Sequence, residues 1–334
     1  MVYLKRDDIL VKKVLITGGS GFIGTNLVEY YNASGCNVIN FDIKKPRNIE
    51  HIDEWREVDL LDQEKLTASI AEVAPDLVFH MAARTDLDGS DVRDYDVNTE
   101  GVDNLINALN TLDTLKLVVF ASSMLVCKLG YVPSSENDYC PDTAYGKSKV
   151  LGAKIIRNTV TKFQWLIVRP TSIWGPWFGS PYRDFFSAIK SNLYVHPKGL
   201  RVCRSYGFVY NTVYQLDCLG RALDTELIGK TFYLADYQVI ELKAWADKIQ
   251  ESLKVKPIKE VPFLLIRIAA KLGDMLKIIG LKNPPMTSFR LNNMRTEMVH
   301  DTLELEAYCG ETPFSTNDGV EITCAWITKN SKPG

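Results

Sequence analysis

Residues 13–31, KVLITGGSGFIGTNLVEYY, decide how this chain folds. Residues 14–16 form a short apolar run rich in β-branched side chains, which predicts a buried strand. Residues 17–21 follow as a glycine-rich turn, and from Phe22 onward apolar side chains recur at helical spacing. A strand, a glycine turn and a helix in this order are the context of a dinucleotide-binding loop, where a bare backbone approaches a pyrophosphate at a helix amino terminus.

Four glycines in this turn and a carboxylate further on carry the cofactor prediction. Gly19, Gly21 and Gly24 fit the pattern G-x-G-x-x-G, and Gly18 gives a second, overlapping fit. The next predicted strand ends on Asp42, whose carboxylate can accept hydrogen bonds from the ribose diol of NAD and would repel the 2′-phosphate of NADP. We therefore predict NAD rather than NADP, although three basic residues within the next five positions weaken this preference.

The bulk composition excludes several classes of protein. The chain has 334 residues, 46% of them hydrophobic, and a net charge of -2, which is typical of a globular protein and gives no basic excess for nucleic acid. The seven cysteines are scattered without a C-x-x-C pair, so neither a zinc site nor a disulfide framework is predicted. We expect reduced thiols, a cytoplasmic location and no metal.

Two segments bear on membrane contact. Residues 1–12 contain charged side chains and no long apolar core, so they are not predicted to be a signal peptide. Residues 261–279 form the most apolar stretch, but four charged residues interrupt it, which argues against a membrane-spanning helix. We predict an amphipathic helix packed on its own domain, without membrane contact. A membrane-surface helix is the alternative, because its polar face would be net basic.

Apolar strands alternate with helical patterns through the first half of the chain. Strands are predicted at 14–16, 37–41, 57–61, 77–80, 116–121 and 164–169, and helices at 22–31, 63–73, 92–112 and 143–160. This alternation predicts an α/β fold with a doubly wound parallel (Rossmann) sheet over residues 1–170. Residues 171–330 are irregular and predict mainly a smaller C-terminal substrate-binding lobe, with some later segments returning to the first domain. Its expected elements are a strand near 206–210 and helices near 184–190, 216–226, 242–253 and 262–279.

Candidate catalytic residues follow the predicted strand 116–121. Ser122 and Ser123 lie at its carboxyl end, and Tyr145 and Lys149 lie one turn apart on the next predicted helix. A lysine ammonium favours the phenolate of a nearby tyrosine and would lower its pKa, and a serine hydroxyl could hold the substrate oxygen. Beside a nicotinamide, these groups suit hydride transfer at a carbinol carbon. Two serines after a strand, and a tyrosine and a lysine four residues apart on a helix, each also occur by chance in unrelated proteins.

Together, these motifs resemble the extended short-chain dehydrogenase/reductases, in the NAD-dependent sugar-nucleotide epimerase/dehydratase group. The resemblance extends from Val14 to Trp326. The matching segments are 17–24 (TGGSGFIG), Asp42, Asp59-Leu60, His80-Met81-Ala82-Ala83, Asn98, Ser122-Ser123, Tyr145-Gly146-Lys147-Ser148-Lys149 and Arg169-Pro170. The resemblance implies that Tyr145 is the catalytic base, that Lys149 holds the nicotinamide ribose and that Ser123 positions the sugar hydroxyl.

The same resemblance implies a set of cofactor-binding residues. Asp59 and Leu60 would flank the adenine, and Asn98 would support the active-site helix. The implied set is Gly18, Gly21, Phe22, Ile23, Gly24, Asp42, Asp59, Leu60, Met81, Ala82, Ala83, Asn98, Ser122, Tyr145 and Lys149.

Residues 124–127 depart from the family pattern. Members usually carry Val-Tyr-Gly at this point, whereas Cys127 stands at the tyrosine position. The 4,6-dehydratases have Asp-Glu directly after the catalytic threonine and the decarboxylases have a glutamate, whereas Met124 and Leu125 cannot transfer protons. Leu125 also replaces the cysteine of the GDP-fucose synthase type. The resemblance thus leaves C4 epimerisation, or simple oxidation or reduction of a sugar carbonyl. Cys127 is a weaker candidate for a nucleophile, because no histidine lies beside it in the sequence to lower its pKa.

Substrate binding is assigned by resemblance to arginines of the second lobe. Residues 204–209, RSYGFV, are similar to the family's Arg-x-Tyr/Phe-x-x-Val segment, in which the arginine binds the substrate diphosphate. Asn211 replaces the aspartate that usually follows. Arg204 is therefore one candidate, and Arg290, with Arg295 as the second choice, is the candidate from the C-terminal third. The alternative for all three is a solvated surface charge.

The leading hypothesis is an NAD-dependent C4 epimerase of a nucleotide-activated sugar, acting by transient oxidation to the 4-keto sugar. The alternatives are an NAD(P)H-dependent 4-ketosugar reductase or sugar-alcohol dehydrogenase, a non-catalytic NAD(H)-sensing scaffold, and a membrane-associated sterol-type dehydrogenase. The resemblance further implies a homodimer through the predicted helices 98–112 and 143–160. Their outer faces are expected to carry Leu105, Ile106, Leu109, Leu151, Ile155 and Ile156.

Overall fold

The computed structural model describes residues 13–279 and 287–330 and divides the chain into two compact units. Unit 1 contains the chain up to Ile173 together with Gly207–Tyr237 and Asp301–Phe314. Unit 2 contains Trp174–Tyr206, Gln238–His300 and the residues from Ser315 onward. The chain therefore leaves unit 1 three times; it returns once for a helix and a strand, and once more for one short helix.

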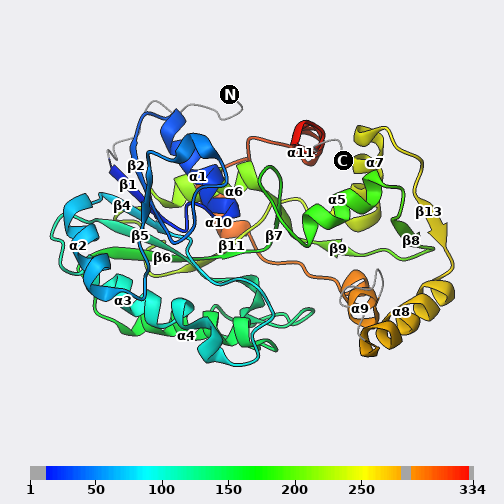
Figure 1. Ribbon diagram of the computed structural model, residues 1–334, viewed down its shortest axis with the longest axis horizontal. Helices are drawn as coiled ribbons and strands as arrows, with labels where there is room; N and C mark the ends of the chain where they lie inside the picture. The colour runs from blue at the N-terminus through cyan, green and yellow to red at the C-terminus, as the bar shows by residue number, and fades with distance from the viewer. Residues whose placement is uncertain (1–12, 280–286, 331–334) are drawn as a thin grey trace. The chain divides into compact units, whose positions relative to one another are not determined.

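A seven-stranded parallel sheet forms the centre of unit 1 (Figure 1). Its strands are β1 (Lys13–Thr17), β2 (Asn37–Asp42), β3 (Trp55–Glu57), β4 (Leu77–His80), β5 (Leu117–Ala121), β6 (Gln164–Pro170) and β11 (Thr231–Leu234). They run in the order β11-β6-β5-β4-β1-β2-β3, and every neighbouring pair is parallel. The order reverses between β1 and β4, and in such sheets ligands bind outside the carboxyl ends of the strands at this reversal.

Helices cover both faces of this sheet, because alternate strand residues point to opposite sides. Val14 and Ile16 belong to one core with α1 (Phe22–Ala33), α6 (Val209–Leu219) and α10 (Leu303–Cys309). Leu15 belongs to the opposite core, with α2 (Gln63–Val73), α3 (Glu100–Leu109) and α4 (Ala144–Asn158). The doubly wound Rossmann-like fold predicted from the alternation of strands and helices is confirmed.

Local capping explains where several of these helices begin. The side chain of Asp62 accepts a hydrogen bond of 3.1 Å from the amide of Lys65 at the start of α2, and Thr143 accepts one of 2.9 Å from Gly146 at the start of α4. The short 3₁₀ helix η2 (Val92–Asn98) begins at Asp91, which forms a capping box with Asp94.

Unit 2 is built from short strands and five helices among its described residues. The helices are α5 (Tyr182–Lys190), α7 (Leu242–Leu253), α8 (Phe263–Ile278), α9 (Ser288–Arg295) and α11 (Thr316–Asn330). The short strands are β7 (Ser172–Trp174) and β10 (Tyr206–Phe208), which span its boundaries, and β8 (Val195–Pro197), β9 (Cys203–Arg204), β12 (Ile240–Glu241) and β13 (Lys259–Val261). Aromatic rings fill its core: Trp174 lies 5.2 Å from Trp245 between ring centroids and stacks on Phe186 at 5.9 Å.

Several predicted elements differ from the structure. The strand expected at 57–61 is β3, which ends at Glu57, and the helix expected at 92–112 is two helices separated at Thr99, whose φ of -124° and ψ of -73° are not helical. The helix expected at 216–226 is α6, which begins seven residues earlier, at Val209. The strand β11 and the helices α10 and α11 were not predicted.

The apolar stretch 261–279 contains the last residue of β13 and the whole of α8. The helix α8 is not the helix with one apolar and one polar face that was expected there. Ile266, Ala270 and Gly273 are its buried residues, but the face turned away from them is apolar rather than polar. Within the described ranges, no helix is both long enough and apolar enough to cross a membrane.

A buried carboxylate joins α1 to α6 and gives a stability prediction. Asp217 is 1% exposed and accepts hydrogen bonds from the hydroxyls of Tyr30 (2.9 Å) and Tyr31 (3.0 Å), while Arg221 forms an ion pair with it at 2.9 Å. We expect Asp217→Ala to lower the free energy of unfolding by about 3 kcal/mol, since it removes the partner of a partly buried guanidinium and the acceptor of two buried hydroxyls. Urea denaturation measures this. Asp113→Ala, which removes an exposed ion pair with Lys162, is the control and should change little. An equal effect of the two variants would contradict the account.

Candidate functional site

The glycine turn between β1 and α1 lies against the chain as it leaves β4. Gly18 has a φ of +73°, and a Cβ there would lie 2.5 Å from the amide nitrogen of Ala82. A Cβ on Gly24 would meet the carbonyl oxygen of Gly18 and lie 2.7 Å from the Cα of Gly19. Gly21, at the N-cap of α1, supplies no side-chain cap to the first amides of the helix. The turn therefore keeps bare backbone at a helix amino terminus, which fits a dinucleotide pyrophosphate.

Asp42 ends β2 beside this turn. Its two carboxylate oxygens accept hydrogen bonds from the amides of Ser20 (3.1 Å) and Lys44 (2.9 Å). Partial burial raises the pKa of Asp42, and these two amides act in the opposite direction. The Nε of Arg47 donates to the carbonyl oxygen of Ser20 at 3.2 Å, so a cation also lies at this turn. The structure thus places Asp42 directly beside the glycine turn.

The remaining cofactor candidates line the same carboxyl edge. Asp59 is exposed and accepts from the amide of Leu61 at 3.0 Å, whereas Leu60 is buried and its carbonyl accepts from Asn104 at 3.0 Å. The half-buried residues 81–83 follow directly from β4. Phe22 and Ile23 are half-buried in the first turn of α1.

Asn98 binds protein groups on two sides. Its Oδ1 accepts from the amide of Arg84 at 2.9 Å, and its Nδ2 donates to the carbonyl of Arg84 and to the hydroxyl of Ser148, both at 3.0 Å. Ser148 in turn donates to the carbonyl of Tyr145 at 2.7 Å. Asn98 therefore ties the segment after β4 to the first turn of α4. This contact network suits the helix-supporting role implied for it rather than direct cofactor contact.

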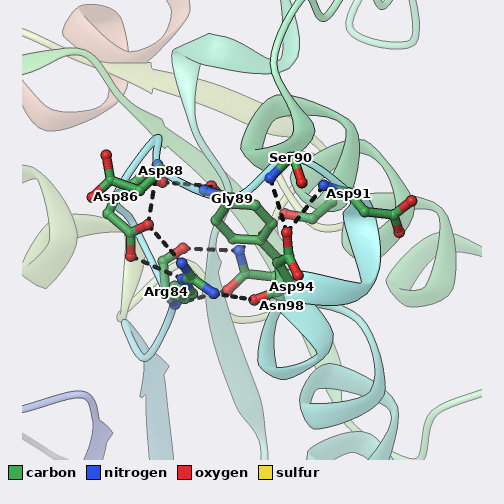
Figure 2. Close-up of polar contacts among 10 residues, drawn as sticks. Arg84, Asp86, Asp88, Gly89, Ser90, Asp91, Asp94 and Asn98 are labelled. Atoms are coloured by element: carbon green, nitrogen blue, oxygen red, sulfur yellow. Dashed lines mark hydrogen bonds and ion pairs between the residues drawn. The ribbon is translucent and has the colours of Figure 1, made fainter. Parts of the chain in front are cut away.

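The loop between Arg84 and Tyr95 was not recognised from the sequence (Figure 2). The guanidinium of Arg84 binds both oxygens of Asp86, at 2.9 and 3.0 Å, and the carbonyl of Asp94 at 2.7 Å. It also lies 4.9 Å from the ring centroid of Tyr95, whose hydroxyl donates to the carbonyl of Asp86 at 2.9 Å. The centroid of the Tyr95 ring lies 6.0 Å from that of the Tyr145 ring, so this hydrogen-bonded loop packs beside the candidate base.

The structure brings Ser123, Tyr145 and Lys149 together in unit 1. All three are buried, and Ser123 is hydrogen-bonded to the side chain of Tyr145. The Nζ of Lys149 donates to the carbonyl of Ala121, at the end of β5, at 2.9 Å. The hydroxyl of Ser122 is buried and has no partner among the described residues, so it is available to a ligand. We call Ser123, Tyr145 and Lys149 the Ser-Tyr-Lys group.

The protonation states in this group differ from the expectation. Burial raises the pKa of Tyr145 to about 12, and the hydrogen bond from Ser123 offsets only part of this rise. The net shift is therefore opposite to the lowering expected from Lys149, whose Nζ donates to the Ala121 carbonyl. Burial lowers the pKa of Lys149 to about 8. His80 bonds the hydroxyl of Thr17 at 2.7 Å, and burial together with the charge of Lys149 lowers its pKa to about 3, so it stays neutral.

Cys127 lies below the surface and does not have the features of a nucleophile. Its thiol contacts the carbonyl of Asp138 at 3.4 Å, and burial raises its pKa. Arg169 lies nearby in the sheet; its guanidinium donates to the hydroxyl of Tyr233 at 3.1 Å and to the carbonyl of Glu136 at 2.6 Å. These contacts give both residues a structural role.

The arginine candidates for substrate binding belong to unit 2, whereas Ser123 belongs to unit 1. Arg204 donates from Nε to the carbonyl of Thr296 at 3.0 Å, and its buried Nη2 has no partner among the described residues. Arg290 lies on α9, but its side chain is outside the described part of the chain. The guanidinium of Arg295 lies 5.0 Å from the ring centroid of Phe263, which favours a structural role. Trp177 and Phe178 pack on Trp326 at 5.7 and 6.3 Å between ring centroids.

A parallel sheet with a glycine turn at its reversal, and a buried tyrosine and lysine on the helix after β5, define an NAD(H)-binding enzyme of the extended short-chain dehydrogenase/reductase type. The sequence model of the NAD dependent epimerase/dehydratase family matches residues 14–221, and the chain belongs to that family.

Relatives of known name agree with this assignment. The chain is 24% identical over 326 residues, 96% of each chain, to N-acetyl-alpha-D-glucosaminyl-diphospho-ditrans,octacis-undecaprenol 4-epimerase of Escherichia coli O157:H7. It is 28% identical over 221 residues, 60% of this chain and 59% of the relative, to 3-beta-hydroxysteroid dehydrogenase of Mycolicibacterium neoaurum. The UDP-glucose 4-epimerase of Thermus thermophilus, solved with NAD, superposes with a TM-score of 0.70 at 21% identity, over 96% of this chain and 100% of that one, and shares its fold.

The buried lysine gives a prediction that separates stability from activity. A pKa lowered from 10.5 to about 8 corresponds to roughly 3 kcal/mol of burial cost at pH 7. Lys149→Met removes this cost and loses one hydrogen bond to Ala121, so we expect it to raise the free energy of unfolding by about 2 kcal/mol at pH 7.

The sign of the pH dependence checks the cause. Between pH 8 and 10.5 the unfolded chain binds more protons at Lys149 than the folded one, so the stability of the wild type rises with pH and the advantage of the variant shrinks. Urea denaturation at pH 7 and about pH 10 measures this, with exposed Lys147→Met on the same helix as the control. A variant that is less stable at pH 7, or an advantage that does not change with pH, would contradict burial as the cause.

Proposed function

We propose that this protein is an NAD-dependent C4 epimerase of a diphosphate-activated sugar, most simply a nucleotide sugar. The observation that carries the proposal is the Ser-Tyr-Lys group at the carboxyl edge of the sheet, followed at positions 124 and 125 by methionine and leucine. A buried base beside a hydroxyl can remove and return the proton of a sugar alcohol. Expelling water would need a further acid, and neither of these two side chains supplies one.

The roles of the three residues follow from their contacts. Tyr145 takes the proton of the C4 hydroxyl, a role that requires its phenolate and therefore a pKa below the value of about 12 that burial gives it in this structure. Ser123, beside Tyr145, binds the same substrate oxygen. Lys149 places a positive charge one turn from Tyr145, and a pKa of about 8 lets it exchange protons near neutral pH. The glycine turn and Asp42 would hold NAD, which would supply the acceptor and the donor of the C4 hydride. Tyr145 then gives its proton back to the C4 oxygen.

The extent of the similarity favours an epimerase over the alternatives. The E. coli lipid-linked sugar epimerase is matched over 96% of its length, whereas the steroid dehydrogenase is matched over 59%. A 4-ketosugar reductase would use the same three residues, but unlike an epimerase it would consume NAD(P)H in each turnover. The intact Ser-Tyr-Lys group argues against a non-catalytic NAD(H)-sensing scaffold.

A second candidate substrate follows from the full-length relative. Its name specifies a sugar carried on undecaprenyl diphosphate, and this chain is a candidate to use a sugar on a polyprenyl diphosphate. A nucleotide sugar and such a lipid-linked sugar share the diphosphate. Arg204, with its unpaired buried Nη2, is the proposed diphosphate ligand in unit 2, and Arg290 is the proposed second one.

We further propose a homodimer, with one correction to the expected interface. Of the six aliphatic residues expected on the outer faces of α3 and α4, Leu105, Ile106, Leu109 and Ile156 point into the core of unit 1. Leu151 is 43% exposed and Ile155 is half-buried, so only these two support a dimer through these helices. We also propose a cytoplasmic location. All seven cysteines lie in the described residues as reduced thiols, which is usual for proteins of a reducing compartment.

Asp42 gives the prediction for cofactor preference. A carboxylate that bonds the adenosine ribose contributes roughly tenfold to NAD affinity and opposes a 2′-phosphate. We expect Asp42→Ser to weaken NAD binding about tenfold. We expect the same variant to bind NADP more strongly relative to NAD than the wild type does, because Arg47 lies nearby and can contact the 2′-phosphate. Calorimetric titration with both cofactors measures this. The exposed Asp53→Ser is the control, and an unchanged NAD to NADP ratio in Asp42→Ser would refute the role of Asp42.

The reaction itself is tested with a panel of substrates. Purified protein is incubated with UDP-, GDP-, dTDP- and CDP-sugars and with a polyprenyl diphosphate sugar, and the products are separated by NMR or mass spectrometry. Absorbance of reduced nicotinamide is followed in parallel. We expect a C4 epimer of one substrate without net cofactor consumption. Stoichiometric loss of NAD(P)H would instead identify a reductase.

Tyr145→Phe tests the assigned base in the same assay. We expect it to lower the rate on the order of 1,000-fold while NAD binding is retained, because it removes only the ionisable oxygen. Tyr308→Phe, which changes a partly exposed tyrosine on α10, is the matched control and should retain activity. Activity of Tyr145→Phe near the wild-type rate would exclude Tyr145 as the base.

A further inference from the structure

Among the described residues, helix α8 of unit 2 has two apolar faces and packs through one of them. Ile266, Ala270 and Gly273 form its buried stripe, and Leu291 of α9 joins Ile266 and Ala270 in a small core. One helical turn has 3.6 residues, so these three positions cover a narrow arc of the helix. Phe263 also packs against this core, whereas the side of α8 opposite the stripe is exposed.

The outward face of α8 is made of aliphatic side chains. Leu265 is 54% exposed, Ile268 48%, Leu272 55% and Met275 63%, and these residues share one side at helical spacing. Further exposed aliphatic residues extend the same surface: Leu264, Leu276 and, at the carboxyl end, Ile278 and Ile279. We call this set the outer α8 face. Scattered exposed apolar residues are ordinary, but a contiguous row marks a surface that is covered in use.

Positive charge borders this face on one side. Between residues 254 and 279 the chain carries six basic and two acidic residues, while the whole chain has a net charge of -2. Arg267 and Lys271, one turn apart, border the outer α8 face on one side and are exposed. One of the two acids, Asp274, accepts a hydrogen bond from the amide of Ser288 at 3.0 Å. The surface therefore combines aliphatic side chains with a basic border.

We propose that the outer α8 face binds an anionic lipid bilayer, with the helix lying in the plane of the interface. Aliphatic side chains enter the boundary between headgroups and acyl chains, and a basic border is attracted to anionic headgroups. A helix of 16 residues is about 24 Å long, less than the roughly 30 Å of a hydrocarbon core, so it lies on the membrane and does not span it.

Charge also decides between this occupant and a second copy of the chain. Contact between two outer α8 faces would bring two net basic segments together, and like charges oppose such a contact. An anionic surface neutralises the same border. An anionic bilayer would therefore bury the aliphatic side chains and neutralise the basic border. This binding does not depend on which sugar the enzyme uses.

The full chain is tested by co-sedimentation with vesicles of phosphatidylcholine, with and without phosphatidylglycerol. We expect binding to the anionic vesicles that weakens at high salt. The double variant Ile268→Glu, Leu272→Glu should bind at least tenfold more weakly, because it places two carboxylates in the outer α8 face. Arg267→Gln, Lys271→Gln should lose on the order of tenfold on anionic vesicles only.

The matched control places the same charges elsewhere. Leu193→Glu, Val160→Glu changes two aliphatic residues that are 77% and 90% exposed outside α8 and should bind vesicles as the wild type does. Circular dichroism and catalytic activity in detergent-free buffer check that every variant is folded. Absence of vesicle binding by the wild type, or equal loss in the control, would overturn the proposal. So would self-association that the α8 variant abolishes while no vesicle binding is seen, since this would identify a second copy as the partner.

Discussion

The buried ammonium of Lys149 is the interaction on which the candidate site depends. An amine inside a protein is costly unless it is bonded, and Lys149 has the carbonyl of Ala121 at the end of β5 as its acceptor. This bond fixes α4 against the carboxyl end of β5 and so fixes Tyr145, one turn earlier, beside Ser123. The cost of burial appears as a pKa lowered to about 8. A group that lowers stability but is held in this position is characteristic of an active site.

The parallel sheet brings the other half of the site to the same edge. Because the strand order reverses between β1 and β4, the glycine turn after β1 and the exit from β4 are neighbours. Gly18 has no room for a Cβ there, and Asn98 connects the segment after β4 to α4 through Ser148. The nucleotide-binding turn and the Ser-Tyr-Lys group are therefore positioned by one set of strand ends.

Local signals allowed much of the fold to be predicted from the sequence. The strand, glycine turn and helix at residues 13–33 were found because their pattern is strong within a few residues, and α2 was found because Asp62 caps it. The strand β11 was missed: it has four residues with only alternate burial and lies in an irregular stretch. The break at Thr99 was missed because apolar spacing continues through it.

The site was only partly accessible to the same reasoning, because some of its properties depend on tertiary contacts. The Ser-Tyr-Lys group could be proposed from spacing, but the pKa of Tyr145 was expected to fall and burial raises it. The Arg84 loop was not found, since its bonds to Asp86 and Asp94 and its position beside Tyr95 require the folded chain. The outward apolar face of α8 also became visible only once the buried stripe of that helix was known.

The central chemical claim is that Tyr145 removes a proton from the sugar hydroxyl oxygen and none from carbon. The most direct test is to run the epimerisation in deuterium oxide with the substrate that the panel identifies, and to examine the product by NMR. We predict that C4 and C5 keep the hydrogens of the starting sugar, with deuterium confined to exchangeable hydroxyls. Deuterium bound to C4 or C5 would contradict the claim, because the proton would then have been taken from carbon.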